Sequence, residues 1–445
     1  MKNLLLGALI ATSFSATAAT IAVIDSGTDT EHVDFQDKIW INAQEIADNG
    51  RDEDGNGYQD DVYGWNFAEQ NNLVIDRSYI GTFSNDPYKF FDIQGKSFLG
   101  EATEEEIAWV NEKRKDPEFI KEMGKFGNFV HGTHVAGITV KDVTDAKILT
   151  VKLIPTEVKL PGSKKYKTMD EGGRERALHA ALNGFAKLQM TMIEEAFYYV
   201  GQHKADIANG SFGTGRDQIR AITDVMYTVI FFKKPTEEQS IKTANYMMNS
   251  LIKYGEKAVA AAPNTLFVFA AGNAGQNNDE IPTSPTNVQA DNVISVAATY
   301  KYNFIAPFSN YGTKMVDVAA PGMLIHSQIP GNEYLKVSGT SQAAPFVARI
   351  AGQIKDSNKN LTPKQIKEII MGTVDKKEFL NKKVKTNGIV NLNRAVHAAK
   401  LTLTMNVGDA IQASNVNVAD IEVFEEKTFL NPELITPIPL PSLFK

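Results

Sequence analysis

The stretch TIAVIDSGTD at residues 20–29 decides the fold. Its first five residues are apolar or β-branched, which is typical of a strand buried in a parallel sheet. The run ends at Asp25 and a Ser-Gly turn, so we expect the strand to present a carboxylate at its carboxyl end. In parallel sheets, functional groups gather just beyond such strand ends.

Similar short apolar runs recur along the chain, and two long helical stretches lie between them. The runs are residues 147–154, 206–208, 265–271, 293–298 and 315–319, and the helical stretches are 171–203 and 216–256 with a break at 233–235. This alternation predicts an α/β fold whose mostly parallel central sheet is covered by helices. Asp25, Ser211 and Asn273 each follow one of the expected strands, so we expect them at one edge of the sheet.

Length and composition narrow the class of protein. The chain has 445 residues, of which 43% are hydrophobic, enough for one large domain with insertions or for two domains. Its formal net charge of −7 argues against a nucleic-acid partner, whose usual footprint is basic. The absence of cysteine from the sequence excludes disulfides, cysteine nucleophiles and thiolate metal sites.

The first residues have the pattern of a cleavable secretory signal. Lys2 is followed by a short apolar run at 4–14 and an A-x-A-like site at Ala16 and Ala18. A membrane anchor needs about 20 apolar residues, and this run is shorter. We therefore expect a signal peptide at 1–18, a secreted or periplasmic mature protein, and no stable membrane span in it.

Three separated motifs supply an acid, a base and a nucleophile. HGTHVAG begins at His131, SGTSQAAP contains Ser341, and Asp25 ends the first strand. A serine hydroxyl is a weak nucleophile at neutral pH, so it needs an imidazole to take its proton and a carboxylate to orient that imidazole. Gly132 and the small residues after it suit the start of a closely packed helix.

The order Asp, His, Ser, with AAGN at 270–273 between base and nucleophile, resembles the subtilases, the subtilisin-like serine peptidases. The pieces FSNYG at 308–312, DVAAPG at 317–322 and GIVNL at 388–392 resemble subtilase segments too. The resemblance implies a three-layer fold with helices on both faces of the sheet. It also implies that Ser341 attacks, His131 moves the proton, Asp25 orients His131 and Asn273 binds the oxyanion.

The same resemblance assigns residues to substrate binding. NGSFG at 209–213 is similar to the subtilase strand that pairs with substrate backbone, so an extended peptide would bind there by strand addition. The residues implied are Ser211, Phe212, Gly213, Ala271 and Gly272. The expected partners are polypeptide substrates, and we expect a monomer.

Two further groups of polar residues need separate interpretation. His134 lies three residues after His131, but the H-E-x-x-H pattern of zinc peptidases is missing, so we expect a hydrogen-bonded core histidine.

DEDGNG at 52–57 has calcium-loop spacing, yet Tyr63 replaces the glutamate expected at the twelfth position of such a loop. A structural calcium ion and an Asx-rich turn both remain open, and the ligands of the former would be Asp52, Asp54, Asn56 and Asp60.

The expected domain organisation follows from these motifs. A peptidase domain spans 19–400, with insertions near 66–128 and 215–262, and an extension follows at 401–445. The extension ends PELITPIPLPSLFK, whose prolines oppose helix and central strand, so we expect an extended, partly disordered segment. Because few residues separate Ala18 from Asp25, we expect folding without an amino-terminal prosegment.

The sequence leaves two alternatives to a subtilase open. A sedolisin-like peptidase shares a serine motif but carries glutamate in place of the histidine and aspartate at the oxyanion position, so His131 and Asn273 count against it. A catalytically inactive peptide-binding protein on the same fold would have no use for an intact Asp25, His131, Ser341 and Asn273.

Overall fold

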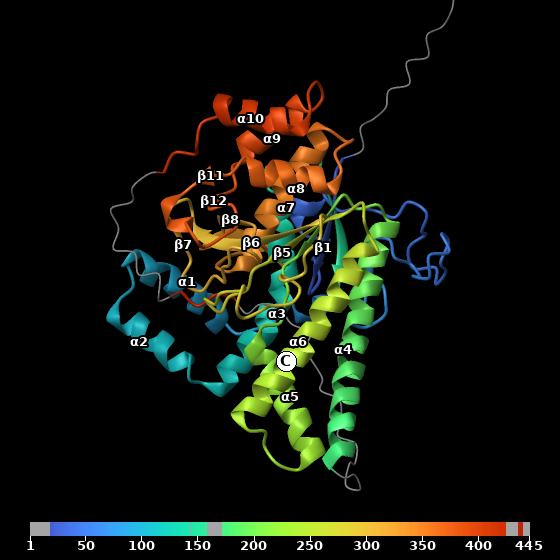
Figure 1. The fold of residues 1–445 in the computed structure, drawn as a ribbon, viewed down its shortest axis with the longest axis vertical. Coiled ribbons are helices and arrows are strands. Elements are labelled where there is room, and N and C mark those ends of the chain that lie inside the picture. Colours follow the sequence, from blue (N-terminus) through green and yellow to red (C-terminus); the bar gives the residue numbers. More distant parts are fainter. Residues whose placement is uncertain (1–17, 144, 158–170, 424–434, 439–445) are drawn as a thin grey trace, which may run out of the picture.

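The structure is a computed structural model that describes residues 18–143, 145–157, 171–423 and 435–438. The expected signal peptide, apart from Ala18, lies outside these residues. A ten-stranded sheet forms the centre of the molecule (Figure 1). Its strands run in the order β11 (Asp375–Lys376), β12 (Gly388–Ile389), β8 (Val318–Pro321), β6 (Val293–Tyr300), β5 (Leu266–Ala270), β4 (Ile207–Gly210), β1 (Thr20–Asp25), β3 (Lys147–Lys152) and β2 (Gly64–Asn66), with β7 (Phe304–Ile305) beside β6.

The sheet is parallel except where β11 pairs with β12 and β7 pairs with β6. Successive side chains of a strand point to opposite faces, so β1 contributes to two separate cores. Ile21 and Val23 pack with α3 (Pro117–Val140), α7 (Thr340–Ser357), α8 (Pro363–Gly372) and α9 (Leu392–Leu401). Ala22 and Ile24 pack with α4 (Glu171–Gln202), α5 (Arg216–Phe231) and α6 (Glu237–Ala260). The predicted three-layer α/β fold is therefore confirmed.

The expected break between the two helical pieces near residue 233 is also observed. Helix α5 ends at Phe231 and α6 begins at Glu237. Thr236 caps α6, because its side chain accepts the backbone N–H of Gln239 while the Gln239 side chain accepts the N–H of Thr236. These two helices and α4 project together beyond the sheet in Figure 1.

The insertion near 66–128 is a small helical unit beside the sheet (Figure 1). It contains η2 (Arg77–Tyr79), α1 (Asp86–Leu99), α2 (Glu104–Lys113) and the first turns of α3. Phe119, Met123 and Phe126 form one buried stripe on α3 and pack against α1 in an apolar cluster. Because this stripe continues the helix, α3 begins at Pro117, and the expectation that His131 opens a helix is wrong.

A two-stranded hairpin that the sequence did not predict leads into the nucleophile motif. It consists of β9 (Ile325–Ile329) and β10 (Glu333–Val337), which pair antiparallel. Gly331 and Asn332 in the turn have positive φ angles of 89° and 64°, as a tight hairpin turn requires. Residue Ser338 then connects β10 to Gly339, which precedes α7.

The carboxyl-terminal extension differs from the expected extended segment. Residues Val407–Asn417 form α10, which begins where the Asn406 side chain accepts the backbone N–H of Asp409. Within the extension, the prolines that oppose helix formation occur only from Pro432 onward. Residues 407–417 are therefore able to form a helix. Residues 435–438 return to the body of the molecule, where Ile435 and Ile438 are buried.

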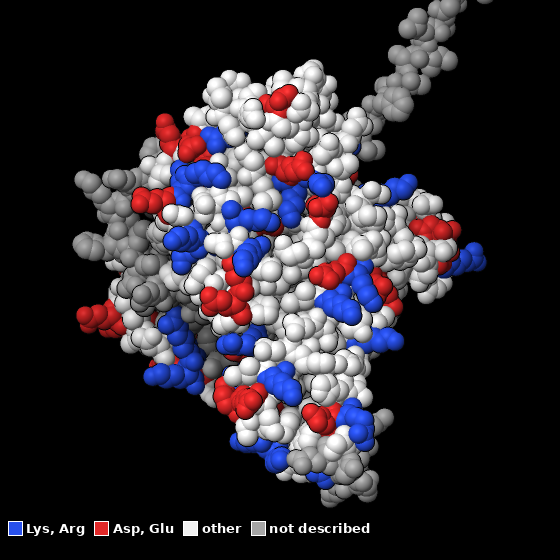
Figure 2. Space-filling model, in the orientation of Figure 1, with Lys and Arg blue, Asp and Glu red and all other residues white. Residues whose placement is uncertain are grey.

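Charged residues of both signs are interspersed over the face drawn in Figure 2. Within the described ranges, no helix combines the length and the apolar character that crossing a membrane would require.

Candidate active site

A buried carboxylate and imidazole form the centre of the site. Asp25 is the last residue of β1, and His131 lies on α3. The Asp25 Oδ1 and His131 Nδ1 atoms are 2.7 Å apart, and both residues are 0% exposed. Asp25 Oδ1 also accepts the backbone N–H of Ser26, which fixes the carboxylate. This arrangement holds the imidazole in one orientation with Nε2 on its far side.

Close contact between α3 and the turn after β1 brings the two groups together. A Cβ atom at Gly132 would lie 2.1 Å from the Gly27 carbonyl oxygen, so only glycine allows this approach. The Gly132 N–H donates to Ser26 Oγ at 3.2 Å, and the Asp29 N–H donates to Thr133 Oγ1 at 2.9 Å. The glycine of the HGTH motif therefore serves to place His131 against Asp25.

Ser341 is the second residue of α7 and is completely buried. Its hydroxyl donates to the Ser211 carbonyl oxygen at 3.1 Å, and the Ser211 hydroxyl donates to the Ser341 carbonyl at 2.9 Å. His131 Nε2 is buried and has no hydrogen-bond partner in the part of the chain that the structure describes. Because a serine has a single O–H donor, Ser341 must release Ser211 before it donates to His131.

Asn273 presents a free amide beside the nucleophile. Its Oδ1 accepts the backbone N–H of Thr340 at 2.9 Å and the Thr340 hydroxyl at 2.8 Å. These bonds fix the amide, and Nδ2 is left buried without a partner among the described residues. A Cβ atom at Gly339 would lie 3.4 Å from Nδ2, so this donor faces the turn that begins α7. It is placed to stabilise negative charge close to Ser341.

The residues expected to bind substrate lie at two neighbouring strand ends. Ser211, Phe212 and Gly213 follow β4, and Ala271 and Gly272 follow β5, which pairs with β4 in parallel. All five are buried. The structure therefore brings every predicted catalytic and substrate-binding residue to the carboxyl edge of β1, β4 and β5.

His134 is the expected core histidine. Its Nε2 lies 3.1 Å from each of the carbonyl oxygens of Ile325 and Leu335, so it joins α3 to both strands of the β9–β10 hairpin. Burial lowers the pKa of His134 to about 3. The side chain is thus neutral and structural.

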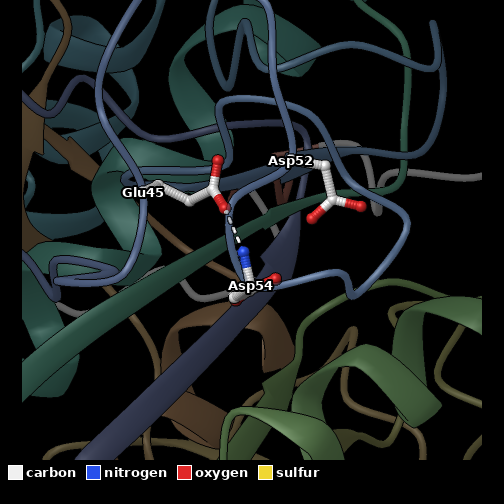
Figure 3. A group of neighbouring side chains, drawn as sticks. All are labelled: Glu45, Asp52 and Asp54. Atoms are coloured by element: carbon white, nitrogen blue, oxygen red, sulfur yellow. Dashed lines mark hydrogen bonds between the residues drawn. The ribbon is translucent and has the colours of Figure 1, made fainter.

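The acidic loop gathers a different set of side chains from the one expected. Ligand atoms of Glu45, Asp52 and Asp54 lie within 4.8 Å of one another (Figure 3). The backbone N–H of Asp54 donates to Glu45 Oε1 at 3.1 Å and helps to orient that carboxylate. Burial is the main cause that raises the pKa of Glu45. Three clustered carboxylates are hard oxygen donors of the kind that calcium prefers.

The other two expected ligands make hydrogen bonds within the loop. Asp60 accepts the backbone N–H groups of Asn49 and Gly50, each at 3.0 Å, and so closes a turn. The Asn56 side-chain oxygen accepts the Tyr58 N–H at 2.7 Å, and its Nδ2 donates to Asp54 Oδ2 at 3.1 Å. The structure thus places Glu45 beside Asp52 and Asp54, and calcium binding by Asp52, Asp54, Asn56 and Asp60 stays a prediction.

Sequence reasoning missed two residues of these sites for different reasons. Thr340 lies inside the serine motif and directly precedes Ser341. This position was the only signal in the sequence that Thr340 orients Asn273. Glu45 lies before the D-x-D-x-N stretch, outside any spacing pattern, and joins it only because the loop folds back.

The chain is similar to several known proteins. The model of the subtilase family matches residues 16–394. Subtilisin-like protease 1 of Plasmodium vivax is 26% identical over 385 residues, which cover 85% of this chain and 47% of the relative. The thermophilic serine proteinase of Bacillus sp. (strain AK1) is 43% identical over 123 residues, 27% of this chain and 29% of that one. A solved lanthipeptide protease structure has 18% identity and a TM-score of 0.48, covering 85% of this chain and 86% of that chain.

The chain belongs to the subtilase family. Members of this family are subtilisin-like serine peptidases, hydrolases that act on peptide bonds. The chain spans about half the length of the Plasmodium protease 1 relatives it matches.

Proposed function

We propose that this chain is a secreted serine endopeptidase that hydrolyses peptide bonds through an acyl-enzyme. One observation supports this most strongly: the buried Asp25–His131 pair leaves His131 Nε2 without a partner among the described residues, at the carboxyl edge where the first turn of α7 carries Ser341. A base with an open ring nitrogen and a carboxylate behind it is what activation of a serine hydroxyl requires.

The reaction follows from the positions of these groups. Ser341 Oγ attacks the substrate carbonyl carbon while His131 Nε2 takes the hydroxyl proton. The Asn273 amide and the free N–H of Ser341 at the start of α7 stabilise the oxyanion. His131 then protonates the leaving amine as the C–N bond breaks. Water hydrolyses the acyl-enzyme by the same proton route in reverse, which restores the Ser341 hydroxyl.

The substrate would be recognised first through its backbone. Residues Ser211, Phe212 and Gly213 continue β4 beyond the sheet edge, and an extended peptide can add to them as a further strand. Incubation with a mixed peptide library tests the activity. We expect internal cleavages by the parent protein and none by Ser341→Ala. Peptide binding without cleavage by the parent would instead support the inactive binding protein.

We also propose export by cleavage of a signal peptide after Ala18, supported by the charged and apolar pattern of the first residues. Mass spectrometry of the exported protein tests this, and we expect a new amino terminus at Ala19. An exported chain that retains Met1 would contradict it.

The acidic net charge of −7 supports a monomer that works without nucleic acid. Size-exclusion chromatography with and without DNA checks this, and we expect the elution volume of a monomer in both cases.

A structural calcium ion is a further proposal, carried by the clustered carboxylates of Glu45, Asp52 and Asp54. The ion would offset the repulsion among these carboxylates and stabilise the loop. It would take no part in the peptidase chemistry, which needs only the residues described above.

A further inference from the structure

The 435–438 segment of the carboxyl-terminal extension returns to the active site. The backbone N–H of Ile438 donates to the Ser338 carbonyl oxygen at 2.9 Å. Ser338 lies between β10 and the start of α7, three residues before Ser341. A main-chain group of the extension therefore bonds directly to the connection between β10 and the helix that carries Ser341.

Two aliphatic side chains anchor this segment. Ile438 is 0% exposed and belongs to an apolar cluster with Val337 of β10 and Val130, the residue before His131. Ile435 is 6% exposed and joins the core on the α7 face of the sheet. Burying an aliphatic side chain is favourable, so the segment gains affinity as well as position from these contacts.

The insertion near 66–128 holds the same segment from the other side. The Thr436 N–H donates to Gln94 Oε1 of α1 at 3.3 Å, and Arg114 Nη2, just after α2, donates to Thr436 Oγ1 at 2.7 Å. Thr436 and Pro437 also line a cavity of about 660 Å³ that extends to Asn128, one turn of α3 before His131. The insertion and the extension thus meet beside the catalytic histidine.

We propose that the 435–438 segment is an internal ligand of the substrate cleft. This inference rests on the proposed peptidase function and names how that site is regulated. A main-chain hydrogen bond combined with buried side chains is how a cleft recognises an extended peptide. The segment therefore occupies a subsite next to Ser341 that takes a β-branched aliphatic residue, and substrate must displace it.

The residues proposed to be catalytic are buried in the structure, in which the segment is bound. Ser341 and His131 are both 0% exposed, so a polypeptide cannot reach the nucleophile while the site is closed. A tethered ligand acts at a high effective concentration, so modest contacts suffice to occupy the cleft. Occupancy reduces the fraction of competent enzyme that substrate encounters, which raises KM and leaves kcat unchanged at saturation.

Substitution in the full-length chain tests the proposal. Ile438→Asp places a charge in the apolar subsite and should release the segment. We expect KM for a peptide substrate to fall at least about tenfold with kcat unchanged. Val416→Asp is the matched control, because Val416 lies on α10 and is 86% exposed, and it should behave as the parent. A fall in both thermal stability and activity of Ile438→Asp would show a purely structural role and overturn the proposal.

A peptide added in trans gives a second measurement that does not depend on folding of the variant segment. The synthetic peptide ELITPIPLPSLFK, residues 433–445, should inhibit Ile438→Asp competitively. The same peptide with aspartate at both isoleucine positions should not. Absence of inhibition, or inhibition that lowers kcat without changing KM, would contradict the proposal.

The outcomes separate this inference from the proposed function. If neither the parent nor Ile438→Asp cleaves peptides, the peptidase function fails. If both cleave with the same KM, the function stands and the internal ligand is wrong.

Discussion

At the residue scale, the candidate active site contains buried polar atoms that make no hydrogen bond with the described residues. Asp25 Oδ2, His131 Nε2 and Asn273 Nδ2 are buried and lack hydrogen-bond partners among the described residues. An unsatisfied buried polar group typically costs about 1–3 kcal/mol. The two free nitrogens are the groups that the proposed reaction assigns to proton transfer and to the oxyanion. Their lack of hydrogen-bond partners lowers the stability of the folded state and leaves both nitrogens available for the proposed reaction.

The free amide of Asn273 predicts a graded series of variants. Asn273→Ala removes the donor and should lower turnover about 10²- to 10³-fold, the cost of losing one such donor in subtilisin. Asn273→Asp keeps the acceptor for Thr340 but places negative charge near the oxyanion, so its turnover should be lower still. Steady-state kinetics with thermal melts as the folding control would check this order. Equal turnover in all three proteins would remove Asn273 from the mechanism.

The sequence allowed candidate catalytic residues to be named because each lies in a local motif that carries its own chemistry. Asp25 ends β1 and Asn273 follows β5, two strands whose carboxyl ends lie at the same edge of a parallel sheet. Ser341 lies in the first turn of α7, whereas His131 lies within α3. The orientation of Ser341 toward the Ser211 carbonyl was not predictable, because it depends on a contact between residues 130 positions apart.

At the element scale, the acidic loop gives a test of calcium binding. If Glu45, Asp52 and Asp54 hold a cation, a chelator should lower the melting temperature of the parent, because a ligand that binds the folded state stabilises it. The double variant Asp52→Asn, Asp54→Asn should lose this response. Asp60→Asn is the matched control, because Asp60 lies in the same loop but faces the turn at Gly50.

The response of Asp60→Asn to chelator should therefore equal that of the parent. A double variant that still responds fully would place any ion elsewhere and favour the Asx-rich turn.

The link between α3 and the β9–β10 hairpin predicts a pH dependence of stability. Burial holds the folded-state pKa of His134 at about 3, whereas an unfolded histidine titrates near 6.5. Between these values the unfolded chain binds one more proton, so stability is full above about pH 6.5 and falls as the pH decreases. The slope from this group is about 1.4 kcal/mol per pH unit.

Urea unfolding at pH 7.5 and pH 5.0 checks this in a Ser341→Ala background, which prevents self-digestion. Between these pH values the His134-containing protein should lose about 2 kcal/mol more than the same protein with His134→Gln. Glutamine does not titrate and can still donate to a carbonyl. Identical losses in the two proteins would show that His134 is not the titrating group.

The strand and helix order followed from sequence more reliably than the helix ends did. The apolar runs identify β1, β3, β4, β5, β6 and β8 because a strand buried on both faces has few polar residues. The start of α3 was misplaced because the stripe of Phe119, Met123 and Phe126 belongs to an insertion that continues an existing helix. Helix α10 was missed because prolines far downstream outweighed the Asn406 cap.

At the scale of the whole molecule, the insertion and the extension act together. The structure joins them through Thr436, Gln94 and Arg114. Such contacts between segments more than 300 positions apart leave no local pattern in the sequence. The sheet and its two helical layers were predictable from the sequence, whereas the position of the extension required the three-dimensional arrangement.

The central claim is that Ser341 is the nucleophile of a peptidase. It is tested most directly by treating the purified protein with a serine-directed fluorophosphonate and locating the adduct by mass spectrometry. We expect a single adduct on Ser341 of the parent, much slower labelling of His131→Ala because the base is lost, and none on Ser341→Ala. Failure of the folded parent to form this adduct, with or without the Ile438→Asp substitution, would contradict the account.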